Sequence, residues 1–246
     1  MIVFASDFGH ADGYVGIVEA AIASLTPDAR VVHLAHDIAP QDVRGGSYVL
    51  WSAAPHLPRG AVVLAVVDPG VGSARRPIAA HGERLSYVGP DNGLFGAAWQ
   101  RDPPREACVL RRDAAARART FDGRDLFGPT AAAIVGGLGL FHLGELVDPA
   151  SLVRAPVLPT RDRRGEVWTF DRFGNAITTI EAEHDTEGAI EIAGRRLPIA
   201  SHYASVEEGA LVAYVGSTGL IEIAVRDGSA RDRLGLRTGA PVLRVT

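Results

Sequence analysis

Asp68, Arg75 and Arg76 stand together in the segment VVDPGVGSARR, where a carboxylate follows the apolar run 61–67 and two guanidiniums come seven and eight residues later. The run is expected to form a buried strand, which places Asp68 at its carboxyl end, where open α/β sheets bind ligands. Pro69 fixes φ, and Gly70 and Gly72 permit backbone conformations and close approaches that side chains would forbid. The spacing alone does not tell the two arginines apart, and D-P-G is also ordinary turn chemistry.

Further carboxylates follow other apolar runs of the chain. Asp7 ends the run IVFAS with Asp12 close behind, Asp91 lies in PDNG, and Asp122 lies in TFDGRD. The carboxyl ends of strands form the ligand-binding edge of open α/β sheets, so repeated acidic groups at such ends favour a site. Asp12 and Asp91 also fit plain turns. Clustered aspartates could hold a divalent metal for phosphoester hydrolysis, or Asp7 could take the diol of a ribose.

Composition excludes several classes of function. The chain has 246 residues and a net charge of −4, and all 25 of its basic residues are arginine, which excludes a Schiff-base lysine and a Walker lysine. The first strand is not followed by G-x-G-x-x-G, so a nucleoside without a phosphate suits this pocket better than a dinucleotide. Cys108 is the single cysteine, which excludes an intrachain disulfide and a cysteine-rich metal site. With no basic block, signal peptide or membrane span, we expect no nucleic-acid or membrane partner and a cytoplasmic location.

The hydrophobic pattern predicts two domains. In residues 1–153, short apolar strands alternate with amphipathic helices, which predicts an α/β domain with a mostly parallel sheet covered by helices. Strands are expected at 2–6, 29–35, 61–67 and 86–89, and helices at 14–25, 42–57 and 124–140. Residues 154–165 are rich in proline and arginine and are expected to form a linker. Strand patterns separated by turn signals predict an antiparallel β-barrel-like domain over 166–246.

Seven segments in order make the sequence resemble the S-adenosylmethionine (SAM) hydrolase family, also called SAM hydroxide adenosyltransferases. They are SDFGHADGYVG, HLAHDIAPQDV, VVDPGVGSARR, VGPDNGL, TFDGRDLFGP, DRFGNAITTI and the tail from SHYASVEEG to GSTGLIEIAVRDGSA. The family is related to the SAM-dependent chlorinases and fluorinases. The resemblance implies attack of water or hydroxide on C5′ of the SAM ribose, which releases methionine and adenosine. It also implies a homotrimer with each site between one subunit's N-terminal domain and a neighbour's C-terminal domain, and no metal or cofactor besides SAM as substrate.

The resemblance assigns hydroxide handling to Asp68 and Arg75, and leaves Arg76 for a structural ion pair. The family's third member is a histidine in T-F-H-G-R-D, whereas this chain has Asp122. A second carboxylate beside Asp68 should raise one of the two pKa values. Asp122 could replace the histidine as general base, or weaken turnover and leave a SAM or adenosine binder, or accompany a different nucleophile. A halide is disfavoured, because Asp68 repels anions and residues 76–90 lack the fluorinase insertion.

Substrate-binding roles carry over to both domains. In the N-terminal domain Asp7 matches the carboxylate for the ribose diol. Asp171 could pair with the methionine amine, Tyr203 matches an aromatic ring that stacks on adenine, and the stretch from Ser217 to Glu222 matches the region that holds the methionine end. The full set of binding residues that we predict comprises Asp7, Asp12, Thr120, Phe121, Asp171, Phe173, Asn175, Tyr203, Ser217 and Glu222.

Overall fold

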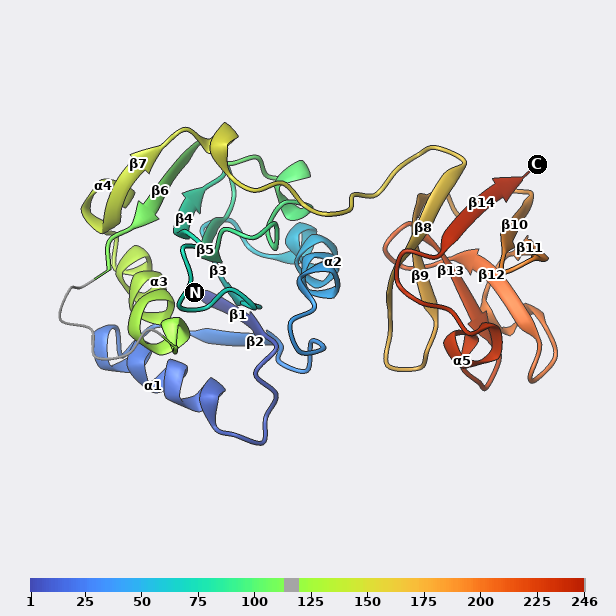
Figure 1. Ribbon diagram of the computed structural model, residues 1–246, viewed down its shortest axis with the longest axis horizontal. Helices are drawn as coiled ribbons and strands as arrows, with labels where there is room; N and C mark the ends of the chain where they lie inside the picture. The colour runs from blue at the N-terminus through green and yellow to red at the C-terminus, as the bar shows by residue number, and fades with distance from the viewer. Residues whose placement is uncertain (113–119, 246) are drawn as a thin grey trace. The chain divides into compact units, whose positions relative to one another are not determined.

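The computed structural model describes residues 1–112 and 120–245, and the chain divides into two compact units (Figure 1). Unit 1 spans Met1–Pro156 and unit 2 spans Val157–Thr246. The division falls within the segment 154–165, and strand β8 already begins at Arg164, inside that segment.

Unit 1 is built on a seven-stranded sheet with the order β2-β1-β3-β5-β4-β6-β7. Strands β2, β1, β3 and β5 pair in parallel, whereas β4 and β7 run against their neighbours. The strands are β1 Ile2–Ser6, β2 Val31–Ala35, β3 Val62–Val66, β4 Pro77–His81, β5 Ser86–Pro90, β6 Glu106–Leu110 and β7 Gly144–Val147. The helices are α1 Tyr14–Leu25, α2 Val43–Ala53, α3 Gly128–Val135 and α4 Leu140–Leu143, and the short turns are η1 Ala54–His56, η2 Ala98–Gln100, η3 Gly123–Phe127 and η4 Pro149–Ser151.

Helices cover both faces of this sheet (Figure 1). One apolar core packs α1 and α3 against one face through Val18, Ile22 and Ala131, and another packs α2 against the opposite face through Leu50. The central strands β1 and β3 are fully buried because side chains on both of their faces enter a core, which explains their continuous apolar sequences. The fold predicted for this unit is therefore confirmed.

The structure corrects two details of the predicted elements. The helix expected over 124–140 is shorter: a π-helical turn, η3, leads into α3, which ends at Val135 because Gly136 and Gly137 follow, the latter with φ of 92°. Strands β4, β6 and β7 are additional to those expected. Each is at most five residues long, and their pairings are antiparallel, so none of them completes a β-α-β rhythm.

Unit 2 is a closed barrel with the strand order β10-β11-β12-β13-β9-β8-β14, closed by pairing of β14 with β10. Its strands are β8 Arg164–Phe170, β9 Ala176–Glu181, β10 Ala189–Ile192, β11 Arg195–Ala200, β12 Leu211–Val215, β13 Leu220–Val225 and β14 Pro241–Val245, joined by the turn η5 Tyr203–Ser205 and the helix α5 Ala230–Leu234. All pairings are antiparallel except that of β11 with β12. Closure removes exposed strand edges and encloses one apolar core. This barrel confirms the fold predicted for the second domain.

Candidate active site

The sheet of unit 1 brings four polar residues to one edge. Strands β1, β3, β5 and β6 run in the same direction, since β5 and β6 are each antiparallel to β4. Their carboxyl ends are followed by Asp7, Asp68, Asn92 and Arg112. Ligands bind at this edge in open α/β sheets, so the topology accounts for the clustering of groups that lie far apart in sequence.

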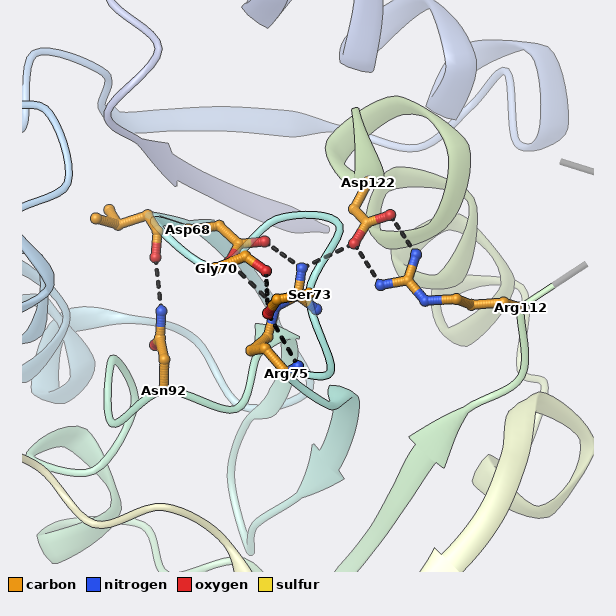
Figure 2. A network of polar contacts seen from close by, with 8 residues as sticks. Asp68, Gly70, Ser73, Arg75, Asn92, Arg112 and Asp122 are labelled. Carbon is orange, nitrogen blue, oxygen red and sulfur yellow. Dashed lines mark hydrogen bonds and ion pairs between the residues drawn. The ribbon is translucent and has the colours of Figure 1, made fainter. Parts of the chain in front are cut away.

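Two aspartates and two arginines alternate in one chain of ion pairs at this edge (Figure 2). Arg75 donates from Nε to Asp68 Oδ1 at 3.1 Å and from Nη2 to Asp68 Oδ2. Nη2 also donates to Asp122 Oδ2 at 2.8 Å. Arg112 donates from Nη1 and Nη2 to the two oxygens of Asp122 at 2.6 and 2.7 Å. The chain Asp68–Arg75–Asp122–Arg112 therefore contains two charges of each sign.

The loop between Asp68 and Arg75 folds back so that the two side chains meet. Ser73 Oγ donates to the carbonyl of Gly70 at 2.6 Å and accepts from the backbone N–H of Arg75 at 3.1 Å. A Cβ at Gly70 would lie 3.3 Å from Ser73 Oγ and 3.4 Å from Arg75 Cβ, so the absence of a side chain there permits the close turn. Arg75 Cζ lies over the Phe127 ring, 5.3 Å from its centroid, which is within the range of a cation–π contact.

Burial makes this cluster electrostatically strong. The side chains of Asp68, Asp122 and Arg75 are 5%, 4% and 7% exposed. Burial raises the pKa of Asp68 above its usual range; contacts with Arg75 oppose this, and the charge of Asp122 adds to it. Burial also acts to raise the pKa of Asp122, but hydrogen bonds from Arg112 and Arg75 outweigh it, and the pKa falls below its usual range. The two carboxylates therefore differ, because arginine contacts favour the anion of Asp122 more than that of Asp68.

Arg76 has a different environment from Arg75. It donates from Nε to Asp91 Oδ2 at 2.8 Å and from Nη2 to the carbonyl of Ser151 at 2.7 Å. Asp91 also accepts from the backbone N–H of Val153 at 2.8 Å. The Arg76–Asp91 pair therefore anchors the end of unit 1, and Arg75 is the arginine that faces Asp68 and Asp122.

A cavity of about 70 Å³ adjoins the ion-pair chain. Its lining includes Asp7, Phe8, Asp68, Thr120, Phe121 and Asp122. Arg75 Nη1 is buried close to these groups and has no hydrogen-bond partner among the residues that the structure describes. A water molecule needs about 10–15 Å³ of such space, so the cavity has room for a few waters. Its lining offers the carboxylates of Asp7, Asp68 and Asp122 as hydrogen-bond acceptors, and Arg75 pairs with two of them from outside the lining.

The other residues predicted for the N-terminal domain lie around this cavity in different ways. Asp7 Oδ2 accepts a hydrogen bond from the backbone N–H of Gln41 at 2.8 Å, which fixes the carboxylate at the end of β1. Phe121 packs edge-to-face against Phe8 and Tyr14, with ring centroids 5.8 and 5.2 Å apart. Asp12 is exposed in the loop before α1 and does not belong to the lining.

A second chain of polar side chains begins at the end of β1, where Ser6 and His36 are buried, and ends at the more exposed His33 and Glu19. Ser6 Oγ lies 2.7 Å from His36 Nδ1, His36 Nε2 lies 2.9 Å from His33 Nδ1, and His33 Nε2 lies 3.4 Å from Glu19. Burial, with nearby His33 and His10, lowers the pKa of His36 to about 4. His36 is therefore neutral at pH 7 and holds the loop after β1, where its carbonyl accepts from the N–H of Gly9 at 2.8 Å.

In unit 2, Asp171 organises the turn between β8 and β9. It accepts from the backbone N–H groups of Phe173 and Asn175 at 2.9 Å each and from Asn175 Nδ2 at 2.8 Å. This leaves Phe173 projecting outward, 74% exposed, while Asn175 Oδ1 is buried without a partner in the described part of the chain. A large exposed ring on a turn held by these hydrogen bonds is a suitable apolar contact for a ligand.

Tyr214 on β12 contacts two of the predicted binding residues, Tyr203 and Glu222. Its hydroxyl donates to Glu222 Oε2 at 2.9 Å, and its ring lies 6.3 Å from that of Tyr203. Burial raises the pKa of Glu222, with the charge of Asp171 adding to the rise and the Tyr214 hydrogen bond opposing it. Tyr203 accepts from the N–H of Asp227 at 2.6 Å, and Ser217 is exposed on the β12–β13 turn.

Sequence reasoning missed Arg112 and Tyr214. Arg112 is the second of two arginines after the apolar run ACVL, and this run was the available signal that an additional strand ends there. Tyr214 occupies an ordinary strand position, and only the pairing of β12 with β13 places it opposite Glu222. Within residues 1–112 and 120–245, no three histidine, cysteine or acidic side chains are arranged to hold a metal ion.

Comparison with known proteins matches both units to one family. The SAM hydroxide adenosyltransferase N-terminal domain model matches residues 2–144, and the corresponding C-terminal domain model matches residues 165–243. The chain is 51% identical to a protein of Thermus thermophilus named (R)-S-adenosyl-L-methionine hydrolase, over 98% of each chain. It is 43% identical to a protein of the same name from Salinispora tropica, over 100% of this chain and 97% of that one.

Structural comparison and more distant relatives give the same result. A crystal structure of a conserved hypothetical protein from Thermus thermophilus superimposes with a TM-score of 0.90, at 50% identity over 99% of each chain. A fluorinase from Actinopolyspora mzabensis is 25% identical over 100% of this chain and 97% of its own. The relationship to the fluorinases expected from the sequence motifs is therefore confirmed.

Proposed function

The chain belongs to the SAM hydroxide adenosyltransferase family, and from that membership and the site geometry we propose that it hydrolyses SAM to adenosine and L-methionine. The observation that carries the proposal is the buried pairing of Asp68 with Arg75 beside a water-sized cavity. This arrangement supplies what displacement from a sulfonium requires. The leaving group departs as a neutral thioether, so the enzyme needs only an oriented and partly deprotonated water.

The reaction balances with the residues present. The water oxygen attacks C5′ of the ribose, the C5′–S bond breaks, and its electron pair goes to sulfur, giving methionine. Asp68, whose pKa is raised by burial, takes the water proton and returns it to solvent. Arg75, which pairs with Asp68 through Nε at 3.1 Å, would favour the anionic form of the nucleophile through its positive charge.

We assign Asp122 a role in holding Arg75 rather than in removing the proton. Both of its oxygens already accept hydrogen bonds from arginines, and its pKa lies below the usual range. A group that accepts three guanidinium N–H donors is a poor base. Asp122 therefore leaves Asp68 as the proton acceptor, which favours hydrolysis over the alternative of a SAM-binding protein without turnover.

Halide as nucleophile is disfavoured by the same cluster. Asp7, Asp68 and Asp122 all line the cavity, and their oxygens can accept hydrogen bonds from a water molecule, whereas a halide ion has no proton to donate to them. The chemistry of the cavity therefore favours water. A metal-dependent phosphoesterase receives no support from the donor set in the described residues.

We propose that the remaining predicted residues bind the rest of SAM. Asp7 would hold the ribose diol beside Thr120 and Phe121, whereas Asp12 stays a prediction. Unit 2 would supply Phe173 and Tyr203 to the adenine ring and Asp171, Asn175, Ser217 and Glu222 to the methionine end. The predicted binding residues are divided between the two units, and we propose a homotrimer in which a neighbour's unit 2 completes each site, as the family resemblance implies.

We propose that SAM is the substrate and that no further cofactor takes part. Cys108 is a buried free thiol, which is compatible with the reducing cytoplasm that the sequence predicts. No helix within the described ranges 1–112 and 120–245 is long and apolar enough to cross a bilayer.

Product analysis tests the proposed function. Purified protein is incubated with SAM, with and without EDTA, and the mixture is separated by liquid chromatography with mass detection. We expect equal amounts of adenosine and methionine, with the same rate in EDTA and no 5′-halogenated nucleoside in excess chloride. Loss of activity in EDTA would overturn the metal-free mechanism, and intact SAM would overturn the enzyme assignment.

A further inference from the structure

The outer end of the ion-pair chain is Arg112, which has no role in the proposed reaction. It follows β6 directly and reaches Asp122 with both terminal nitrogens at 2.6 and 2.7 Å (Figure 2). This forked contact fixes the plane of the carboxylate as well as its position. Its side chain is 32% exposed, while the Asp122 side chain that it holds is 4% exposed.

Charge balance shows what Arg112 does for the site. Without it, Asp68 and Asp122 would share the single positive charge of Arg75 in a buried cluster. Two buried carboxylates with one cation retain a proton, and Arg75 would be drawn toward whichever carboxylate is ionised. With Arg112 present the net charge of the four groups is zero. Asp122 then stays ionised while it accepts a hydrogen bond from Arg75 Nη2 at 2.8 Å.

We propose that Arg112 is a positioning residue for hydrolysis: it locks Asp122 in one orientation, so that Asp122 holds Arg75 against Asp68. Arg112 is not among the residues that line the cavity, and its contact with that lining is the fork to Asp122. Its effect on the reaction passes through Asp122 and Arg75. The expected effect on turnover rests on the proposed function. The expected effect on the orientation of Asp122 rests on the geometry alone.

The kinetic test is Arg112→Gln, with Arg111→Gln as the matched control. Arg111 is the neighbouring residue, its side chain is exposed, and its replacement removes the same charge. We expect Arg112→Gln to lower kcat about 10- to 100-fold, because Arg75 is no longer held in place. KM should change less than about threefold, since Arg112 adds no contact to substrate. The acid limb of the kcat–pH profile should move to higher pH by about one unit.

Arg112→Lys separates charge from geometry. It keeps the positive charge but cannot form the fork, so we expect the acid limb to return toward that of the unaltered protein while kcat stays reduced. Arg111→Gln should leave both kcat and the profile unchanged. A profile of Arg112→Gln that superimposes on that of the unaltered protein, at equal kcat, would overturn the proposal.

A readout independent of turnover separates this proposal from the proposed function. Carboxyl ¹³C chemical shifts of Asp122, assigned with Asp122→Asn, are followed against pH in the unaltered protein and in Arg112→Gln. We expect the pKa of Asp122 to rise in the variant, whether or not SAM is hydrolysed. If the unaltered protein fails to turn over SAM but this rise is seen, the hydrolase assignment is wrong and the effect of Arg112 on Asp122 is confirmed. An unchanged titration of Asp122 would overturn the proposed effect of Arg112.

Discussion

Arg75 Nη2 donates to Asp122 Oδ2 at 2.8 Å while the same guanidinium pairs with Asp68, so one arginine links two buried carboxylates. The two carboxylates differ in what else they contact. Both line the small cavity, but Asp122 accepts two further hydrogen bonds from Arg112, whereas the arginine that Asp68 contacts is Arg75. Their pKa values move in opposite directions for this reason. The pair therefore divides into a proton acceptor and a fixed anchor.

Replacement of Asp68 tests the proton acceptor. Asp68→Asn should lower kcat by about 100- to 10,000-fold, the usual contribution of a general base. SAM binding, measured by calorimetry, should change little, because the carboxylate acts on water. A variant that retains more than a third of the original kcat would show that another group takes the proton.

The pH dependence of kcat follows from the raised pKa of Asp68. Asp68 must be ionised to accept a proton, so activity should fall as pH decreases through its pKa in the folded protein. Because burial raises that pKa, the limb should lie above the range of an ordinary aspartate. Rates from pH 4 to 9 locate it. A rate that is constant down to pH 4 contradicts the assignment.

Arg75 and Arg76 should differ in what their loss affects. Arg76→Met leaves Asp91, whose side chain is 1% exposed, without its cation, so the free energy of unfolding should fall by about 3 kcal/mol. Where the variant folds, kcat should stay within about threefold, because Arg76 lies outside the ion-pair chain. Arg75→Met should instead abolish turnover. Urea unfolding and kcat are measured on both variants. Loss of turnover in a folded Arg76→Met, with turnover retained in Arg75→Met, would refute the prediction.

His36 predicts a pH dependence of stability. Its pKa in the folded protein is about 4, below the value of 6.5 expected when unfolded. Between these two values the unfolded chain binds the extra proton, so stability is complete above pH 6.5 and decreases as pH falls toward 4. The loss attributable to His36 is on the order of 3 kcal/mol. His36→Asn should flatten this part of the urea-measured stability curve; an unchanged slope would assign it to other groups.

Phe173 predicts a binding defect without a stability defect. The ring is 74% exposed, so Phe173→Ala should leave the melting temperature within about 2 °C. If the ring contacts the adenine, KM for SAM should rise about tenfold. Phe141→Ala is the matched control, since that ring is 61% exposed in unit 1. Equal KM values for the two variants would remove Phe173 from the binding site.

The parts of the site that the sequence revealed are those set by local geometry. Asp68 and Arg75 are seven residues apart on one glycine-containing loop, so their contact could be predicted. Spacing alone could not say which of Arg75 and Arg76 faces Asp68, because adjacent residues leading into a strand point to opposite sides, and it was the family resemblance that indicated Arg75. The role of Arg112 in the site was missed. Its contact with Asp122 depends on β6, a short strand whose neighbours β4 and β7 are both antiparallel to it.

The fold shows the same limit. Buried strands such as β1 and β3 have unbroken apolar sequences, and both were predicted. The prediction of one helix over 124–140 was wrong, because residues 123–127 form a π-helical turn. Such a short turn has no sequence period by which it could be recognised. That turn begins immediately after Asp122 and helps to place it. The local departure from a regular helix therefore lies where the chemistry is.

The most direct test of the account is the fate of the oxygen from water. The unaltered protein is incubated with SAM in ¹⁸O-water without added metal, and the adenosine is analysed by mass spectrometry. Hydrolysis at C5′ with Asp122 in place predicts adenosine that carries one ¹⁸O, together with an equal amount of methionine. Intact SAM, with labelled adenosine formed only by an Asp122→His variant, would contradict it and leave a protein that binds SAM without turning it over.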